Sequence, residues 1–190
     1  MSEILKNFNY WQGERIRLRA IEAEDWETFY QWNSDSETAR ACYFIPFPQS
    51  RASERKWATE KTAEESKNDL FYFVIESLSG DLIGTINTHT CNQRNRTFMY
   101  GIAILADHRC KGYASETIQL VLKYYFEELG YQKVTVQIYA FNEASIKLHE
   151  KLGFQREGCL RRMIYTGGIY HDEMIYGLTV DEFIERKKSN

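Results

Sequence analysis

The sequence predicts an α/β domain of the α+β kind, in which a mixed, mostly antiparallel sheet carries helices on both faces. Segments rich in β-branched and aromatic residues alternate with helical segments along the chain. Three strands expected within residues 70–105 follow one another closely, which is typical of antiparallel pairing. A long helix then joins the third of them to a strand at 133–140, and such a crossover is typical of parallel strands.

The elements expected before residue 70 are one strand and two helices. Residues 14–20 alternate apolar with charged side chains, which predicts a strand. Aromatic residues recur at helical spacing in 23–33. An aromatic loop that holds both prolines of the chain separates this helix from a polar helix at about 51–67.

The elements expected after residue 70 are mainly strands, which we assign to 70–77, 82–89, 96–105, 133–140, 156–166 and 170–179. The crossover helix at 112–129 keeps its apolar residues on one face. A shorter helix at 142–152 ends at Gly153. The Gly167-Gly168 pair predicts a tight turn between the last two strands.

Composition excludes several classes of protein. The 190 residues show no linker or repeat, so we expect one domain over residues 1–190 with its core at about 14–180. A net charge of -3 does not predict the positively charged surface that binds nucleic acid, and it slightly favours a cationic partner. No stretch is apolar enough for a membrane span, and the start of the chain lacks the features of a signal peptide. The four cysteines form no CxxC pair, which predicts no metal site and reduced thiols in a cytoplasmic protein.

The segment 107–116 is the strongest functional signal. It leads from a strand to the start of the long helix, where free backbone N–H groups and the helix dipole favour a phosphate. Gly112 allows close approach of an anion, and Arg109 and Lys111 add positive charge. The competing interpretation is an ordinary turn with a solvated basic pair.

Further motifs continue from this segment in a specific order. They are Tyr100-Gly101-Ile102-Ala103-Ile104, Arg109-x-x-Gly112-x-Ala114 with Glu116, Asn142-x-x-Ser145, Lys151-Leu152-Gly153-Phe154, Glu157-Gly158 and Tyr170-x-Asp172. Each is weak alone, but their order and spacing over 14–180 resemble the GCN5-related N-acetyltransferase (GNAT) superfamily. The resemblance is closer to its ribosomal-protein and polyamine acetyltransferase-like branch.

This resemblance implies a GNAT fold with a splayed central parallel strand pair. It implies direct transfer of an acetyl group from acetyl-CoA to a primary amine within a ternary complex, without a metal. The amine could be a protein N-terminus, a polyamine or another small molecule, and the sequence leaves a homodimer open. The implied coenzyme-binding residues are Ile102, Ala103, Ile104, Arg109, Cys110, Lys111, Gly112, Tyr113, Ala114, Ser115, Asn142 and Ser145.

Catalytic residues are less clear from the sequence. Many members of the family place a tyrosine acid at the position of His149, so His149 is the candidate acid here. Candidate bases are His89 and Tyr100, or a chain of ordered water. Each histidine could instead be structural. A backbone N–H of Ile102 or Ala103 would stabilise the charge that develops on the carbonyl oxygen.

An aromatic and acidic rim is expected to bind the acceptor amine. We assign it to the aromatic residues Trp32, Tyr43, Phe44, Phe47 and Trp57 and to the acidic residues Asp35 and Glu37. These aromatic side chains could equally fix a loop to the core. The alternative to an enzyme is a non-catalytic acyl-CoA-binding sensor or partner module, because the usual tyrosine acid is absent. A nucleotide-phosphate enzyme is disfavoured, since the chain has no GxxxxGK[ST] loop.

Overall fold

The computed structural model describes residues 9–42 and 44–189. Its elements are, in order, β1 (Ile16–Arg19), η1 (Ala23–Asp25), α1 (Trp26–Trp32), α2 (Ser36–Cys42), α3 (Arg51–Thr62), β2 (Tyr72–Ser77), β3 (Leu82–Asn92), β4 (Thr97–Ile104), η2 (Ala106–His108), α4 (Tyr113–Lys123), η3 (Tyr124–Glu128), β5 (Lys133–Tyr139), α5 (Glu143–Lys151), β6 (Gln155–Thr166), β7 (Ile169–Thr179) and α6 (Val180–Ser189). Within these residues no helix has both the length and the apolar character needed to cross a bilayer.

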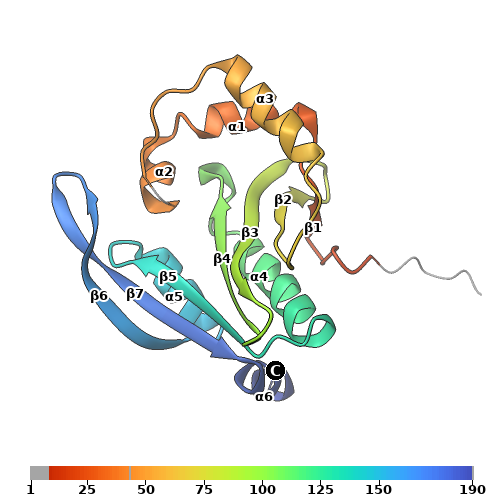
Figure 1. Cartoon of the computed structure of the whole chain (residues 1–190), viewed down its shortest axis with the longest axis vertical. Coiled ribbons are helices and arrows are strands. Elements are labelled where there is room, and N and C mark those ends of the chain that lie inside the picture. Colours follow the sequence, from red (N-terminus) through yellow and green to blue (C-terminus); the bar gives the residue numbers. More distant parts are fainter. Residues whose placement is uncertain (1–8, 43, 190) are drawn as a thin grey trace, which may run out of the picture.

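The strands form one seven-stranded sheet in the order β1-β2-β3-β4-β5-β7-β6 (Figure 1). All neighbouring strands are antiparallel except β4 and β5, which are parallel and joined through α4. The predicted mixed, mostly antiparallel sheet with one crossover is therefore confirmed.

The central parallel pair is joined at one end only. Thr97, Phe98 and Met99 of β4 face Lys133, Val134 and Thr135 of β5, and beyond these three pairs the described residues show no further pairing between the two strands. Figure 1 shows β4 and β5 meeting at one end and diverging toward α2. The splayed pair that the resemblance implied is present, and it leaves one edge of β4 without a strand partner.

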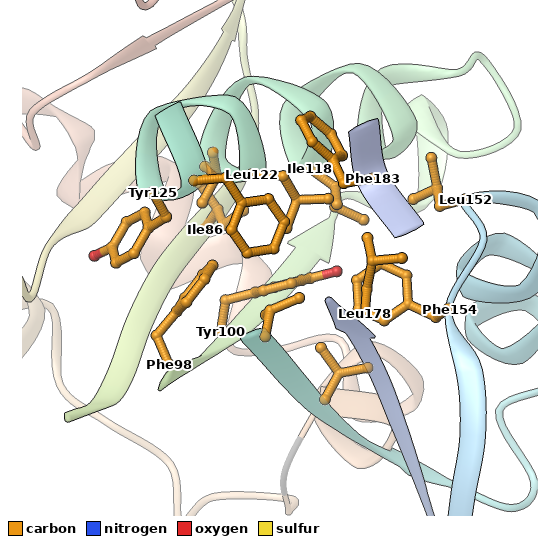
Figure 2. Close-up of a cluster of buried hydrophobic side chains, with 14 of the residues drawn as sticks. Ile86, Phe98, Tyr100, Ile118, Leu122, Tyr125, Leu152, Phe154, Leu178 and Phe183 are labelled. Carbon is orange, nitrogen blue, oxygen red and sulfur yellow. The ribbon is translucent and has the colours of Figure 1, made fainter. Parts of the chain in front are cut away.

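Both faces of the sheet are covered, as predicted. Along β2, Val74 packs into a cluster with Ile21 and Phe29 below α1, whereas Ile75 belongs to the larger core on the opposite face. Alternation of side chains along a strand produces this division. Figure 2 shows the larger core, where Ile118 and Leu122 of α4 lie against side chains of the sheet.

Three elements differ from the expectation. The segment 36–42 is helical, although its sequence has no apolar period. The crossover helix ends as a π-helix, η3, in which Tyr125 packs against Phe98 with ring centroids 4.0 Å apart. The helix α6 follows β7 directly, and its first turn is fixed by Thr179 and Glu182, whose side chains bind each other's backbone N–H groups.

Candidate functional site

The loop between β4 and α4, from Arg109 to Ser115, turns sharply into the helix, and we call it the cradle. The chain turns at Cys110, where φ is 60°, and again at Gly112, where φ is 83° and ψ is -2°. Gly112 is the N-cap of α4, so the backbone N–H groups of the first turn, beginning at Tyr113, have no partner within the helix. Together with the helix dipole they favour a phosphate at this position.

Arg15 lies behind the cradle and was not predicted from the sequence. Its Nε donates to Oε2 of Glu116 at 2.9 Å, and its Nη1 donates to the Lys111 carbonyl at 3.2 Å. A Cβ atom at Gly112 would lie only 2.7 Å from Nη1 of Arg15. The left-handed φ at this position favours glycine, and a larger residue would also displace the end of the Arg15 side chain.

Arg109 connects the cradle to helix α2. Its Nε donates to the Ile104 carbonyl at 3.1 Å, and its Nη2 donates to the hydroxyl of Thr38. Thr38 in turn donates to the carboxylate of Asp35, and this bond, together with the backbone N–H of Thr38, lowers the pKa of Asp35. Asp35 thus caps α2, and two hydrogen bonds hold the exposed Arg109 side chain against β4 and α2.

A small cavity of about 90 Å³ lies between the diverging strands. It is lined by Ala41, Cys42, Tyr100, Gly101, Ile102, Val136, Gln137, Ile138, Tyr139, Asn142, Ser145 and His149. Asn142 is the N-cap of α5, where its Oδ1 accepts from the Ser145 N–H at 3.1 Å. Five residues predicted from the sequence, Tyr100, Ile102, Asn142, Ser145 and His149, are therefore brought together here.

Tyr100 and His149 form a buried hydrogen-bonded pair at the wall of this cavity. The Tyr100 hydroxyl lies 2.8 Å from Nε2 of His149, whose Nδ1 lies 2.7 Å from the Ser145 carbonyl. A carbonyl only accepts, so Nδ1 carries the proton and Nε2 accepts from Tyr100. Burial lowers the pKa of His149 and raises the pKa of Tyr100, which keeps both side chains uncharged.

A larger pocket of about 480 Å³ lies on the other side of β4, under helices α1–α3. We call it the acceptor pocket, and its lining is Phe29, Trp32, Asn33, Thr38, Ala39, Cys42, Gln49, Ser53, Glu54, Trp57, Tyr72, Thr85, Asn87, Gly101, Ile102 and Ala103. Gly101 and Ala103 lie opposite Asn87 and Thr85 of β3 on this face. The pocket and the small cavity share Cys42, Gly101 and Ile102, so the two spaces meet at the strand edge.

Only some of the residues predicted to bind the acceptor line the acceptor pocket. Trp32 lines the acceptor pocket. Phe44 and Phe47 are 57% and 89% exposed and are absent from its lining, so their contact with an acceptor stays a prediction. Asp35 is engaged in capping α2 and is also absent from the lining. Tyr43 lies outside the described residues.

His89 lies on β3 and lines neither space. Its Nδ1 is 3.1 Å from the Thr90 hydroxyl, and burial lowers its pKa. Across residues 9–42 and 44–189, no three His, Cys, Asp or Glu side chains are grouped to hold a metal ion.

Asn33 and Glu54 are among the polar residues of the acceptor pocket that were not predicted from the sequence. Nδ2 of Asn33 donates to Oε1 of Glu54 at 2.6 Å, and Glu54 is only 6% exposed. In a polar helix a glutamate is normally solvated, so the sequence carried no signal for its burial. Glu54 and Ala58 are the buried residues of this helix, which packs against α1.

Comparison with known proteins identifies a family. The family model described as an acetyltransferase (GNAT) domain matches residues 15–155. The SPbeta prophage-derived uncharacterized N-acetyltransferase YokL of Bacillus subtilis (strain 168) is 41% identical over 174 residues, which are 92% of this chain and 95% of that protein. The putative ribosomal N-acetyltransferase YdaF of the same organism is 33% identical over 104 residues, or 55% of this chain and 57% of that protein.

A solved structure has the same fold. The spermidine N-acetyltransferase from Vibrio cholerae, crystallised in complex with CoA and spermine, superposes with a TM-score of 0.78 at 23% identity. The superposition covers 90% of this chain and 99% of that chain.

Proposed function

Because the chain belongs to the GNAT family of acetyl-CoA-dependent N-acetyltransferases, we propose that its acceptor amine occupies the acceptor pocket and receives the acetyl group at Gly101 and Ile102. The resemblance, the fold class and the transfer of acetyl from acetyl-CoA to an amine are confirmed by these relatives, and a non-catalytic module is not favoured. One observation supports the proposal above others: the acceptor pocket and the small cavity meet at residues that they share.

On the coenzyme side, the residues of the cradle fit the diphosphate of CoA. Acetyl-CoA supplies an acetyl group activated as a thioester. The cradle from Arg109 to Ser115 offers backbone N–H groups and two positive charges, and the free edge of β4 offers the N–H group of Ile102. Asn142 and Ser145 lie at the opposite wall of the small cavity.

The Tyr100–His149 pair is better suited to accept a proton than to donate one. Nε2 of His149 presents a lone pair, and the bond to Ser145 fixes the proton on Nδ1. A proton that leaves the amine can pass to the Tyr100 oxygen while the Tyr100 proton passes to Nε2. The departing thiolate needs little help, since a thiol has a pKa of about 8.5. We therefore propose that Tyr100 is the proton acceptor and that His149 acts through it.

Release of free thiol from acetyl-CoA across a panel of primary amines tests this function. We expect turnover with at least one amine, and binding of CoA without turnover on any amine would return the chain to the non-catalytic class. Gly101→Val places a side chain toward Asn87, whose Oδ1 lies 3.2 Å from the position of its Cβ atom, and so fills the acceptor pocket. This variant should lose at least tenfold in kcat/KM for the amine while its calorimetric affinity for CoA stays within threefold. Unchanged amine kinetics would contradict entry through this pocket.

A further inference from the structure

We propose that Glu54 binds a positive charge in the acceptor pocket and thereby selects amines that carry a second cationic group. The inference rests on the proposed entry of the amine through this pocket and adds the class of acceptor. Glu54, on helix α3, is in this proposal the residue that determines specificity for the acceptor.

Glu54 is a buried carboxylate in a pocket without a compensating charge. It is the only charged residue among the described residues that line the pocket, and no salt bridge of the described residues includes it. A carboxylate removed from water costs free energy unless a partner compensates it. A cationic ligand would supply the missing partner.

The position of the carboxylate is fixed before any ligand binds. Glu54 lies in the first turns of α3, after the N-cap Ser50, where the helix dipole favours a negative charge. Its Oε1 accepts from Nδ2 of Asn33, which joins α3 to the end of α1. Among the described residues no donor is bound to Oε2. One oxygen is therefore anchored and the other is available to a ligand.

Aromatic side chains line the same pocket as this carboxylate. Phe29 lies between Trp57 and Trp32, with ring centroids at 5.2 Å and 6.3 Å, and all three line the pocket. Tyr72 lies near enough to Glu54 that the carboxylate contributes to raising its pKa, after burial as the main cause. Aromatic faces attract cations, and exclusion of water strengthens the attraction between opposite charges.

The reaction itself requires that the charge bound by Glu54 is not on the reacting amine. A nitrogen that attacks a thioester must be uncharged, and it does so at the strand edge next to Gly101 and Ile102. Glu54 lies on α3, at the helical wall of the same pocket. An acceptor that satisfies both positions therefore carries a neutral reacting amine at one end and a cation at the other, as a diamine or a longer polyamine does.

The test compares 1,6-diaminohexane with hexylamine, which differ in the second amino group. We expect the unchanged protein to prefer the diamine by at least tenfold in kcat/KM, about the effect of one charge-assisted hydrogen bond in a dry site. Glu54→Gln keeps an oxygen for Asn33 but removes the charge. It should raise KM for the diamine tenfold or more, with kcat and the kinetics of hexylamine within twofold, so that the preference disappears.

Glu60→Gln is the matched control, because it removes one negative charge from the exposed face of the same helix. It should leave the preference intact. If the unchanged protein shows no preference, or if Glu54→Gln slows both amines equally at unchanged melting temperature, Glu54 is not the selector. Those results leave acetyl transfer itself standing, whereas absence of thiol release with every amine would instead overturn the proposed function.

Discussion

The hydroxyl of Tyr100 on β4 lies 2.8 Å from Nε2 of His149 on α5, across the gap between the diverging strands. The two side chains are 5% and 2% exposed, and their rings are stacked with centroids 5.9 Å apart. His149 is held from its other nitrogen by the Ser145 carbonyl. A side-chain hydrogen bond thus connects β4 to α5, the helix that follows β5, at a level where β4 and β5 are no longer paired.

Replacement of His149 by alanine should slow turnover much more than it weakens binding. The variant removes the proton acceptor behind Tyr100, and such groups contribute about 10²-fold or more to rate. We expect kcat to fall by about 10²-fold or more, while the affinity for CoA measured by calorimetry changes by less than threefold. His89→Ala is the control, since His89 lines neither space, and it should retain kcat within twofold. Equal turnover of His149→Ala and the unchanged protein would assign His149 a structural role.

His149 should also make stability depend on pH. Burial lowers its pKa below the ordinary value of 6.5, so the unfolded chain binds a proton where the folded chain does not. Folding therefore releases a proton from His149 in this pH range. The contribution of neutral His149 to the free energy of unfolding is complete above pH 6.5 and is lost as the pH falls below this value. His149→Gln should show a smaller drop in the free energy of unfolding between pH 7 and pH 5 by urea titration. Burial also lowers the pKa of His89, which therefore contributes equally to the pH dependence of both proteins. The difference between the two urea titrations then reports on His149 alone.

Gly112→Glu should abolish coenzyme binding. The new side chain would carry a negative charge into the cradle, with its Cβ atom against Arg15 and its backbone in the left-handed region. Gly130→Glu is the matched control, because φ is also positive there, at 67°, and nothing lies within 4 Å of the added Cβ. Both variants should lose about 1 to 2 kcal/mol of stability from backbone strain. Only Gly112→Glu should lose heat of binding with CoA, and unchanged affinity would contradict the cradle.

Arg109→Ala should affect both substrates. The side chain joins the cradle to Thr38, which lines the acceptor pocket, so its loss frees α2 as well as removing a charge near the diphosphate. We expect the Kd for CoA and the KM for the amine each to rise by about threefold or more. Lys111→Ala removes a charge from the same loop, but Lys111 is exposed and its side chain makes no hydrogen bond or ion pair with the described residues. It should raise the Kd alone. Identical effects of the two variants would show that Arg109 acts only through its charge.

Much of the fold could be predicted because the local patterns were unambiguous. The strands and α4 lie where the periodicity of apolar residues predicts them, and their ends differ from the prediction by a few residues. Helix α6 could have been predicted too, since Thr179-x-x-Glu182 is a capping box before an amphipathic segment. The π-helix could not, because it depends on how Tyr125 packs against Phe98 in the core.

The site was predictable where backbone conformation defines it and not where tertiary packing does. Gly112 and Asn142 are recognisable from their positions at helix starts. Glu54 and Arg15 are ordinary charged residues in sequence, and only the placement of α3 and of the segment before β1 brings them to the pocket and the cradle. The neutral state of His149 likewise follows from its burial, which the sequence does not specify.

The three residue pairs that join β4 to β5 also have a mechanical consequence. Four strands lie on one side of this junction and three on the other, so a rotation of the two parts of the sheet against each other would be centred here. From Met99 to Ile104 a strand extends about 16 Å, at about 3.3 Å per residue. A rotation at this junction would displace the Ile104 end of β4 most and Tyr100, the residue after Met99, least. Phe98 and Val134 are buried at this junction, so their packing resists such a rotation and limits how far the free end of β4 can move from β5.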